Sequence, residues 1–294
     1  SDWSSDVCSS DLALGMGSYA SVPLGLGAVF SGIPLALHEG NSGMGQANRW
    51  LSRWARVLGL SFPLHPPVPT RARQVLVGMP IRDAIIAAAD ADAAAVRAEL
   101  CAELDLDPGK SIVFIFGGSQ GAPPITAAVH GLLPLLTDRQ KADLQFIHFT
   151  GQEDPAATEQ AYRDAGVGVV VKPRDPEIHR YYLAADHIIC RAGASTIAEL
   201  AVLGKAPLMI PYPGAKEDHQ TTNAKGVLAV EGGWLIPQAE LTAERLRAQV
   251  DQWLTKPPDR GRNIRRIARP QAGGEMVKEL RGILETASPR REVR

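Results

Sequence analysis

Two segments of this sequence place small residues and hydroxyl groups directly after an apolar run, a pattern typical of phosphate-binding turns. The first is Gly117–Ala122 (GGSQGA), which follows the apolar run Ile112–Phe116. Glycines let backbone amides approach a ligand closely, and a helix that follows would direct its positive end at a diphosphate. The segment is not a P-loop, because no Lys-Ser or Lys-Thr pair follows it.

The second segment is Arg191–Glu199 (RAGASTIAE), which follows an apolar run ending at Cys190. Its small residues predict a helix start whose unpaired amides again suit a phosphate. Glu199, about one turn into that helix, could accept two hydrogen bonds from a ribose diol. The alternative is a first-turn acid that interacts favourably with the helix dipole. We expect the turns around Ser119 and Ser195 to converge on one pocket that binds a pyrophosphate.

A long polar loop, Pro211–Ala224, leads into a further predicted helix. A loop of this length at the carboxyl end of a strand is unusual without a function. Gln220 and Asn223, three positions apart, should face the same way at the helix start. The structural alternative is that Asp218 or Asn223 caps the helix.

A third polar group, His38–Asn41 (HEGN), follows the predicted strand Pro34–Leu37. An imidazole, an acid and an amide at the carboxyl end of a strand could contact a base or a sugar. Asn41 as a simple N-cap is the alternative.

The first turn also matches Gly-x-Ser-x-Gly, the nucleophile elbow of α/β-hydrolases. Ser119, either Asp186 or Asp218, and His219 occur in the chain order of such a triad. However, Asp186 begins a predicted strand, away from the loops at the strand ends. Asp218 adjoins His219, which leaves little room for a separate orienting carboxylate. A hydrolase is therefore the less favoured interpretation.

Two Asp-x-Asp matches, Asp90–Asp92 and Asp105–Asp107, could suggest a metal–diphosphate site. Neither follows a strand, so we interpret both as helix caps or solvated surface. The sequence holds no zinc-type cluster of Cys and His, and we expect neither a metal nor a cofactor. The three cysteines, Cys8, Cys101 and Cys190, lie far apart, which predicts reduced thiols and a cytoplasmic setting.

Composition excludes some partners. The 294 residues carry 31 basic and 32 acidic side chains, a net charge of -1, so no nucleic-acid partner is indicated. Ser1–Leu12 (SDWSSDVCSSDL) lacks the regions of a signal peptide, and we interpret it as a non-native stub. Ala13–Leu37 carries no charge, but its glycines and prolines favour a loop, a buried helix and a buried strand over a membrane span.

The elements that must position these loops alternate as strand, loop and helix from Ser111 onward, which predicts a parallel sheet with helices on both faces. The predicted strands are Ile112–Phe116, Leu144–Phe149, Val167–Val171, His187–Cys190, Pro207–Ile210 and Trp234–Ile236. Ligands bind outside the carboxyl ends of such strands.

A shorter α/β piece precedes this sheet. It comprises the strand Pro34–Leu37, a helix over Met44–Val57 and strands at Leu58–Phe62 and Gln74–Val77, with a hinge at Gly78–Pro80. Ala84–Leu104 and Glu275–Thr286 are predicted helices. We therefore divide the chain into residues 1–12, a first domain 13–82, a second domain 83–272 and a C-terminal helix and tail 273–294.

In this order, the segments resemble the MurG family of N-acetylglucosaminyltransferases over about Ala13–Thr286. The matching stretches are Gly15–Ser21, His38–Asn41, Gly78–Arg82, Gly117–Ala122, Arg191–Glu199, Asp218–Ala224, Leu235–Gln238 and Glu240–Thr242. The resemblance implies the α/β GT-B fold, in which two Rossmann-like domains with parallel sheets face a cleft, the first domain being incomplete here.

The family transfers N-acetylglucosamine from UDP-N-acetylglucosamine to the 4-hydroxyl of the muramoyl sugar of lipid I, which gives lipid II with inverted configuration. The resemblance therefore implies UDP-N-acetylglucosamine and membrane-bound lipid I as partners, together with the cell-wall synthesis machinery. It places the protein peripherally on the cytoplasmic face of the bacterial inner membrane.

The resemblance also assigns residue roles. Ser119 and Gln120 would contact the diphosphate, Glu199 the ribose, Gln220 the N-acetylglucosamine, and Asp175 would lie near the uracil. Asn41 and Arg82 would close from the first domain and the linker. The remaining candidates for nucleotide and sugar contacts are Ala194, Ser195, Thr196, Ile197, Ala198 and Asn223.

The sequence departs from the family pattern at several positions. Gly40 replaces the usual Gln and Met79 the usual Asn, while Ser18 and Val22 replace glycines. The first glycine-rich loop of the family, with its candidate base His, is expected upstream of Ala13. Tyr19 and Glu39 are then the catalytic candidates near the acceptor. Two alternatives stay open: a UDP-sugar-binding fragment without activity, and a GT-B transferase with another lipid acceptor.

Overall fold

The computed structural model describes residues 11–255 and 259–287, so most of the predicted stub, Cys8 and the tail after Ala287 lie outside the described residues. The chain divides into two units. Unit 1 combines the chain up to Pro80 with the chain from Arg269 onward, and unit 2 comprises Ile81–Ala268. The predicted C-terminal helix thus groups with the first unit rather than standing apart.

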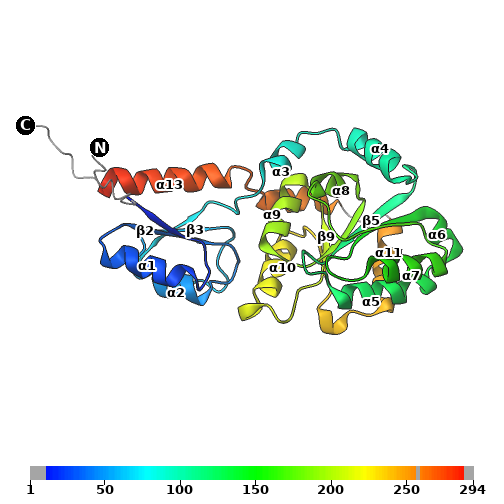
Figure 1. The fold of residues 1–294 in the computed structure, drawn as a ribbon, viewed down its shortest axis with the longest axis horizontal. Helices are drawn as coiled ribbons and strands as arrows, with labels where there is room; N and C mark the ends of the chain where they lie inside the picture. Colours follow the sequence, from blue (N-terminus) through cyan, green and yellow to red (C-terminus); the bar gives the residue numbers. More distant parts are fainter. Residues whose placement is uncertain (1–10, 256–258, 288–294) are drawn as a thin grey trace, which may run out of the picture. The chain divides into compact units, whose positions relative to one another are not determined.

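Unit 1 is built on a four-stranded parallel sheet in the order β1-β2-β3-β4. Its strands are β1 (Ala13–Gly15), β2 (Leu35–Glu39), β3 (Val57–Leu60) and β4 (Arg73–Leu76), and its helices are α1 (Ser21–Phe30), α2 (Gln46–Leu51) and α13 (Ala272–Ala287). Because side chains alternate along a strand, Leu35 and Leu37 pack in one apolar cluster with Leu51 of α2, while Ala36 packs with Met276 of α13 in another. Helices therefore cover both faces of this sheet (Figure 1).

Unit 2 is a six-stranded parallel sheet in the order β10-β9-β8-β5-β6-β7. Its strands are β5 (Ser111–Phe116), β6 (Leu144–Phe149), β7 (Val169–Lys172), β8 (His187–Cys190), β9 (Pro207–Met209) and β10 (Trp234–Leu235). The helices are α3 (Asp83–Ala88), α4 (Ala93–Leu104), α5 (Pro123–Leu132), α6 (Asp138–Asp143), α7 (Pro155–Ala165), α8 (Ile178–Ala184), α9 (Ala194–Leu203), α10 (His219–Ala229), α11 (Ala243–Leu254) and α12 (Arg260–Ile264).

The core of unit 2 has two layers. Val113 and Ile115 of β5 pack in one cluster with Ile125 of α5 and Leu246 of α11. Phe114, between them in sequence, faces the other side of the sheet and packs against Tyr181 and Tyr182 of α8 with tilted rings. The expected α/β fold with parallel sheets is confirmed.

The strand order of unit 2 reverses direction between β5 and β8, which lie side by side at the centre of the sheet. From β5 the chain continues to β6 and β7 on one side, and from β8 to β9 and β10 on the other. In doubly wound sheets a crevice forms at such a switch point, outside the carboxyl ends of the two central strands. The two glycine-containing turns follow these two strands.

Most predicted strands are confirmed to within two residues, whereas three helix predictions are wrong. The predicted helix Met44–Val57 is reduced to Gln46–Leu51, because Val57 already begins β3. Ala84–Leu104 is two helices, and the carboxylate of Asp92 accepts from the Ala94 and Ala95 amides to cap the second. The helix predicted as buried within residues 13–37 exposes Leu24 and Phe30, at 76% and 85%.

Among the described residues, no helix has both the length and the apolar character that a bilayer crossing requires.

Candidate functional site

The turns after β5 and β8 meet at one cavity of about 340 Å³ in unit 2. The Cα atoms of Phe116 and Cys190 are paired at the ends of the two strands, so both turns leave the sheet at the same level. Ser119 from the first turn and Ser195 and Thr196 from the second line the cavity. The expected convergence of the two turns is therefore present.

The second turn presents backbone amides at the start of α9. Gly193 is the N-cap residue of this helix and has no side chain to cap it. None of the described residues accepts a hydrogen bond from the amides of Ala194, Ser195 and Thr196. Three unpaired amides at the positive end of a helix make a ready anion site.

The first turn differs from the sequence expectation, which gave α5 the same role. Pro123 and Pro124 occupy the first positions of α5 and have no amide hydrogen to donate. The Ala122 amide is bonded to Oε1 of Glu153 at 2.8 Å, and that of Ile125 to the Ala122 carbonyl. An anion at this turn must therefore be bound by the loop itself, around Ser119. The sequence alone could have indicated this difference, because two prolines at a helix start remove two amide donors.

Close backbone packing fixes the conformation of the first turn. Gly121 has a φ of +81° and Gly151, in the loop after β6, a φ of +64°. A Cβ atom added to Gly151 would overlap the backbone of Gly121. Only glycine allows the two loops to approach this closely in a left-handed conformation.

Glu199 lies in the second turn of α9 and lines the cavity. Its side chain is 11% exposed. Arg82 donates to Oε1 at 3.2 Å, and the hydroxyl of Tyr182 donates to Oε2 at 3.1 Å. These partners hold the carboxylate at the cavity wall, which a role in the helix dipole alone would not require.

Tyr182 is a member of this site that sequence reasoning missed. It is buried, lines the cavity and packs against Phe116 at a ring distance of 5.6 Å. Burial, followed by the charge of Glu199, holds the pKa of Tyr182 well above its usual value. Aromatic residues in an amphipathic helix look like core residues in a sequence, so only the geometry reveals the contact.

Asp175 also lines the cavity, but its carboxylate is bonded within its own loop. It accepts from Lys172 at 3.2 Å, from the Tyr181 hydroxyl at 2.7 Å and from the Glu177 amide at 2.9 Å. Burial acts to raise the pKa of Asp175, but these three hydrogen bonds lower it. Asp175 therefore fixes the loop after β7, and this loop forms one wall of the cavity.

Several predicted site residues do not line this cavity. Gln220 accepts from the Tyr212 amide at 2.9 Å, and Asn223, in the interior of α10, donates to the Ala192 carbonyl at 3.2 Å. Asn223 thus supports the turn after β8 and is not a cap, and the side chain of Asp218 makes no cap hydrogen bond. The other predicted residues of unit 2 outside the lining are Gln120, Ala194, Ile197 and Ala198.

In unit 1, His38 and Glu39 end strand β2 rather than following it. Glu39 is buried and accepts from the Asn41 amide at 3.1 Å, the Gly45 amide at 3.0 Å and the Asn48 side chain at 2.9 Å. This carboxylate holds the loop before α2, which counts against its predicted role as a base. Asn41 does not cap α2, because the N-cap residue is Gly45.

Tyr19, the other catalytic candidate, is exposed and its hydroxyl donates to Oε1 of Gln46 at 3.1 Å. It lines a cavity of about 440 Å³ in unit 1 together with Val22, Gln46 and Trp50. The Tyr19 hydroxyl is thus accessible to a ligand of unit 1.

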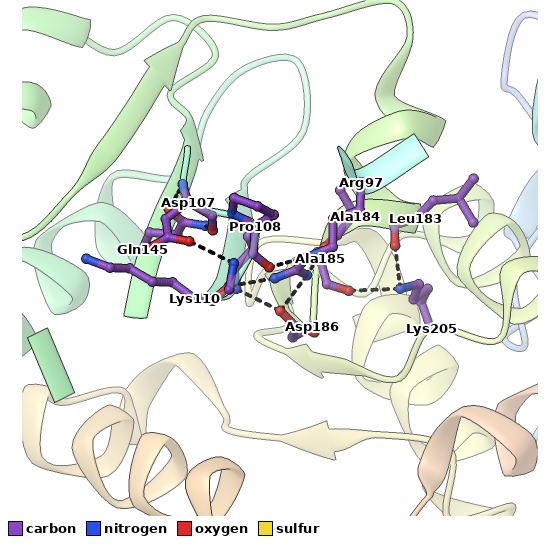
Figure 2. Close-up of polar contacts among 12 residues, drawn as sticks. Arg97, Asp107, Pro108, Lys110, Gln145, Leu183, Ala184, Ala185, Asp186 and Lys205 are labelled. Carbon is purple, nitrogen blue, oxygen red and sulfur yellow. Dashed lines mark hydrogen bonds and ion pairs between the residues drawn. The ribbon is translucent and has the colours of Figure 1, made fainter. Parts of the chain in front are cut away.

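The alternative hydrolase triad is not assembled. Asp186 precedes β8 and accepts from Arg97 at 2.8 Å (Figure 2) and from the Ile112 amide at 2.8 Å. This cluster lies at the amino ends of β5 and β8, whereas Ser119 lies beyond the carboxyl end of β5. Among the described residues, no group of three or more His, Cys, Asp or Glu side chains could hold a metal ion.

Comparison with known proteins places this geometry in a family. The model of the glycosyltransferase family 28 C-terminal domain matches residues 112–273, and that of the N-terminal domain matches residues 8–58. A transferase from Paramagnetospirillum magneticum is 34% identical over 281 residues, 94% of this chain and 73% of its own length. One from Rhodospirillum centenum is 36% identical over 84% of this chain and 63% of its own length. Both are named UDP-N-acetylglucosamine–N-acetylmuramyl-(pentapeptide) pyrophosphoryl-undecaprenol N-acetylglucosamine transferase.

The chain belongs to the MurG family of glycosyltransferase family 28. The crystal structure of Acinetobacter baumannii MurG superposes with a TM-score of 0.75 at 29% identity, over 92% of this chain and 73% of that one. S. aureus MnaA, with a TM-score of 0.64 at 12% identity, shares the fold. The glycosyltransferase and the GT-B fold expected from the sequence are confirmed. The MurG relatives above are longer, since this chain spans 63% to 73% of their length.

Proposed function

We propose that this chain transfers N-acetylglucosamine from UDP-N-acetylglucosamine to the muramoyl 4-hydroxyl of lipid I, which forms lipid II. One observation carries the donor half of this proposal: the turns around Ser119 and Ser195 and the carboxylate of Glu199 line the same cavity at the switch point of unit 2. The MurG relatives, whose names state this donor and this acceptor, support both halves.

The diphosphate of the donor binds at the amides that begin α9 and at the Ser119 turn. These groups are already oriented, so they stabilise the negative charge that develops on the departing UDP without reorganisation. Glu199 accepts from the ribose hydroxyls. Gln220, Asn41 and Arg82 remain proposed contacts of the sugar and the diphosphate.

The reaction is a direct displacement. The acceptor 4-hydroxyl oxygen forms a bond to the anomeric carbon as the bond from that carbon to the phosphate oxygen breaks, and a base takes the hydroxyl proton. This path inverts the anomeric configuration. Of the two residues predicted from sequence, we retain Tyr19 near the acceptor and not Glu39, because Glu39 is buried and three hydrogen bonds hold its carboxylate in the loop before α2.

Lipid I resides in a membrane, and unit 1 has a surface suited to one. Helices α1 and α2 contact each other. We define the α1/α2 face by exposed residues of α1 (Leu24, Phe30), of α2 (Arg49, Trp50) and of the turn just after α2 (Arg53, Trp54). Apolar side chains enter the interface of a bilayer while arginines attract anionic headgroups. We therefore propose that this face binds the cytoplasmic surface of the inner membrane, where contact with the cell-wall synthesis machinery would follow.

The function is tested by incubating the protein with UDP-N-acetylglucosamine carrying a labelled sugar and with lipid I in anionic vesicles. The expected product is labelled lipid II together with UDP. Binding of UDP-N-acetylglucosamine in calorimetry without product would favour the fragment that only binds the donor. Product with another lipid-linked sugar and none with lipid I would favour a different acceptor. Labelling of Ser119 by a fluorophosphonate would revive the hydrolase.

A further inference from the structure

The carboxylate of Glu199 is held from two sides by residues on other elements. Arg82, just after the boundary of unit 2, bonds Oε1, while Tyr182 of α8 bonds Oε2. Each carboxylate oxygen accepts about two hydrogen bonds, so one direction at each oxygen stays available. Because Glu199 lines the cavity, a ligand in the cavity can donate to its oxygens from the directions that Arg82 and Tyr182 leave open.

We propose that Tyr182 is a positioning residue that orients Glu199 toward the vicinal hydroxyls of a nucleotide, and that this makes the site select ribonucleoside over 2′-deoxyribonucleoside diphosphates. The inference rests on the proposed function, since it concerns the same donor site. It adds a residue to that site and a basis for its choice of sugar.

The Tyr182 ring is well placed for this task because it is buried and packed between other aromatic rings and Glu199. Its side chain is buried, and its ring lies 6.0 Å from that of Phe114 and 5.6 Å from that of Phe116, between β5 and α9. Within the described part of the chain, the Tyr182 hydroxyl donates its hydrogen bond to Glu199. The high pKa of Tyr182, due first to burial, keeps the phenol proton available for this bond.

Arg82 alone would not fix the carboxylate. Its side chain is 52% exposed, and it also donates to the Pro176 carbonyl at 3.2 Å. A long exposed side chain can follow a rotating carboxylate, whereas a rigid buried phenol restrains it. Tyr182 therefore determines where the second oxygen of Glu199 points.

The test uses Tyr182→Phe, which keeps the ring packing and removes only the hydroxyl. Tyr162→Phe is the matched control, since Tyr162 of α7 is also a buried tyrosine, but its hydroxyl bonds His148 and it does not line the cavity. Calorimetry measures the affinity of each protein for UDP and for 2′-deoxy-UDP. Loss of one positioning hydrogen bond should weaken UDP binding by about fivefold in Tyr182→Phe. Binding of 2′-deoxy-UDP should change by less than about twofold, because it lacks one of the hydroxyls that Glu199 recognises.

The ratio of the two affinities is the decisive quantity. The ratio should fall in Tyr182→Phe and stay at the wild-type value in Tyr162→Phe, and Tyr182→Phe should raise KM for the donor and leave kcat unchanged. An unchanged ratio in a folded Tyr182→Phe protein would overturn the inference. If the wild-type protein bound neither nucleotide, the proposed function itself would fail, and thermal melting identifies a variant that has merely unfolded.

Discussion

Arg82 and Glu199 are 117 positions apart in sequence and form an ion pair at 3.2 Å within unit 2. The pair ties the segment that begins unit 2 to the helix whose N-terminus meets the cavity. Because Arg82 is half exposed, the pair itself adds little to stability, and its value lies in where it holds the Glu199 carboxylate. The pair makes α9 central to the proposed donor site.

Proline at the start of α9 should remove an anion-binding amide without unfolding the helix. Ala194 is the first residue of α9, a position where proline fits, and Gly193 already has the extended conformation that a following proline prefers. In Ala194→Pro, calorimetry should show UDP affinity reduced by about tenfold, the loss of one charge-assisted hydrogen bond.

The matched control for this substitution is Ala93→Pro, at the first position of α4. Asp92 caps that helix through the Ala94 and Ala95 amides, so the Ala93 amide is dispensable. Both variants should melt close to the wild-type temperature, and only Ala194→Pro should bind UDP more weakly. Equal UDP affinity in the two would contradict a role for the α9 amides.

Alanine at Gly151 should disturb the first turn. The left-handed φ costs about 1 kcal/mol for a residue with a Cβ, and overlap with the Gly121 backbone adds to that cost. Gly166→Ala is the control, because Gly166 has a similar φ of +68° with open space around its Cβ position. Urea unfolding should show Gly151→Ala less stable than Gly166→Ala by at least about 1 kcal/mol, with weakened UDP binding only in the former. Equal losses would show that the two loops do not constrain each other.

Acid should destabilise unit 2 through His187. Burial lowers the pKa of this residue from 6.5 to about 4, and its ring stacks on Trp253 at 4.5 Å. As the pH falls, the unfolded state therefore binds this proton before the folded state does. The contribution of His187 to the free energy of unfolding is complete above pH 6.5 and is lost between pH 6.5 and pH 4, by up to about 1.4 kcal/mol per pH unit. His187→Phe keeps the stack and removes the titration. Unfolding free energies between pH 7 and pH 4.5 should fall less steeply in the variant, and parallel curves would contradict the assignment.

Charge reversal on the α1/α2 face should weaken membrane binding. In Arg49→Glu/Arg53→Glu, flotation with vesicles rich in anionic lipid should show binding reduced by more than tenfold, since each basic residue near such a surface contributes about 1 kcal/mol. The control is Arg139→Glu/Arg163→Glu, the same reversal at two exposed arginines of unit 2. Comparable losses from both pairs would show a general charge effect and no specific face.

Much of the fold was predictable because β6 and β8 are apolar runs bounded by polar and small residues. The alternation of strands and helices implies parallel strands whose carboxyl ends share one edge of the sheet. The pairing of β5 with β8, which the structure shows, then brings Ser119 and Ser195 together. Helix ends were harder: Leu51–Val57 has helical spacing, but Val57 pairs with Ala36 and begins a strand. Sheet pairing overrode local preference there.

The site was less predictable where a contact joins distant elements. Nothing near Tyr182 in sequence indicates that its hydroxyl bonds Glu199, and the Asp175 carboxylate is occupied by Lys172 and Tyr181 only because β7 and α8 bring them together. A carboxylate or a phenol can bind a ligand or hold a loop in place. Which of the two it does depends on the hydrogen-bonding groups that the fold places beside it. Pro123 and Pro124 are the exception, since their missing amides follow from residue type alone.

The final helix, α13, belongs to unit 1, where it packs its Met276 and Ile283 on Ala36 and Val57 and pairs Glu279 with Arg73 of β4. Unit 2 is thus inserted within unit 1, and the polypeptide passes between them twice. An expression fragment that stops after Ala268 would strip one side of the N-terminal sheet and leave its apolar residues open to aggregation. Fragment design for the N-terminal half therefore has to supply residues 269–287, either in the chain or as an added peptide.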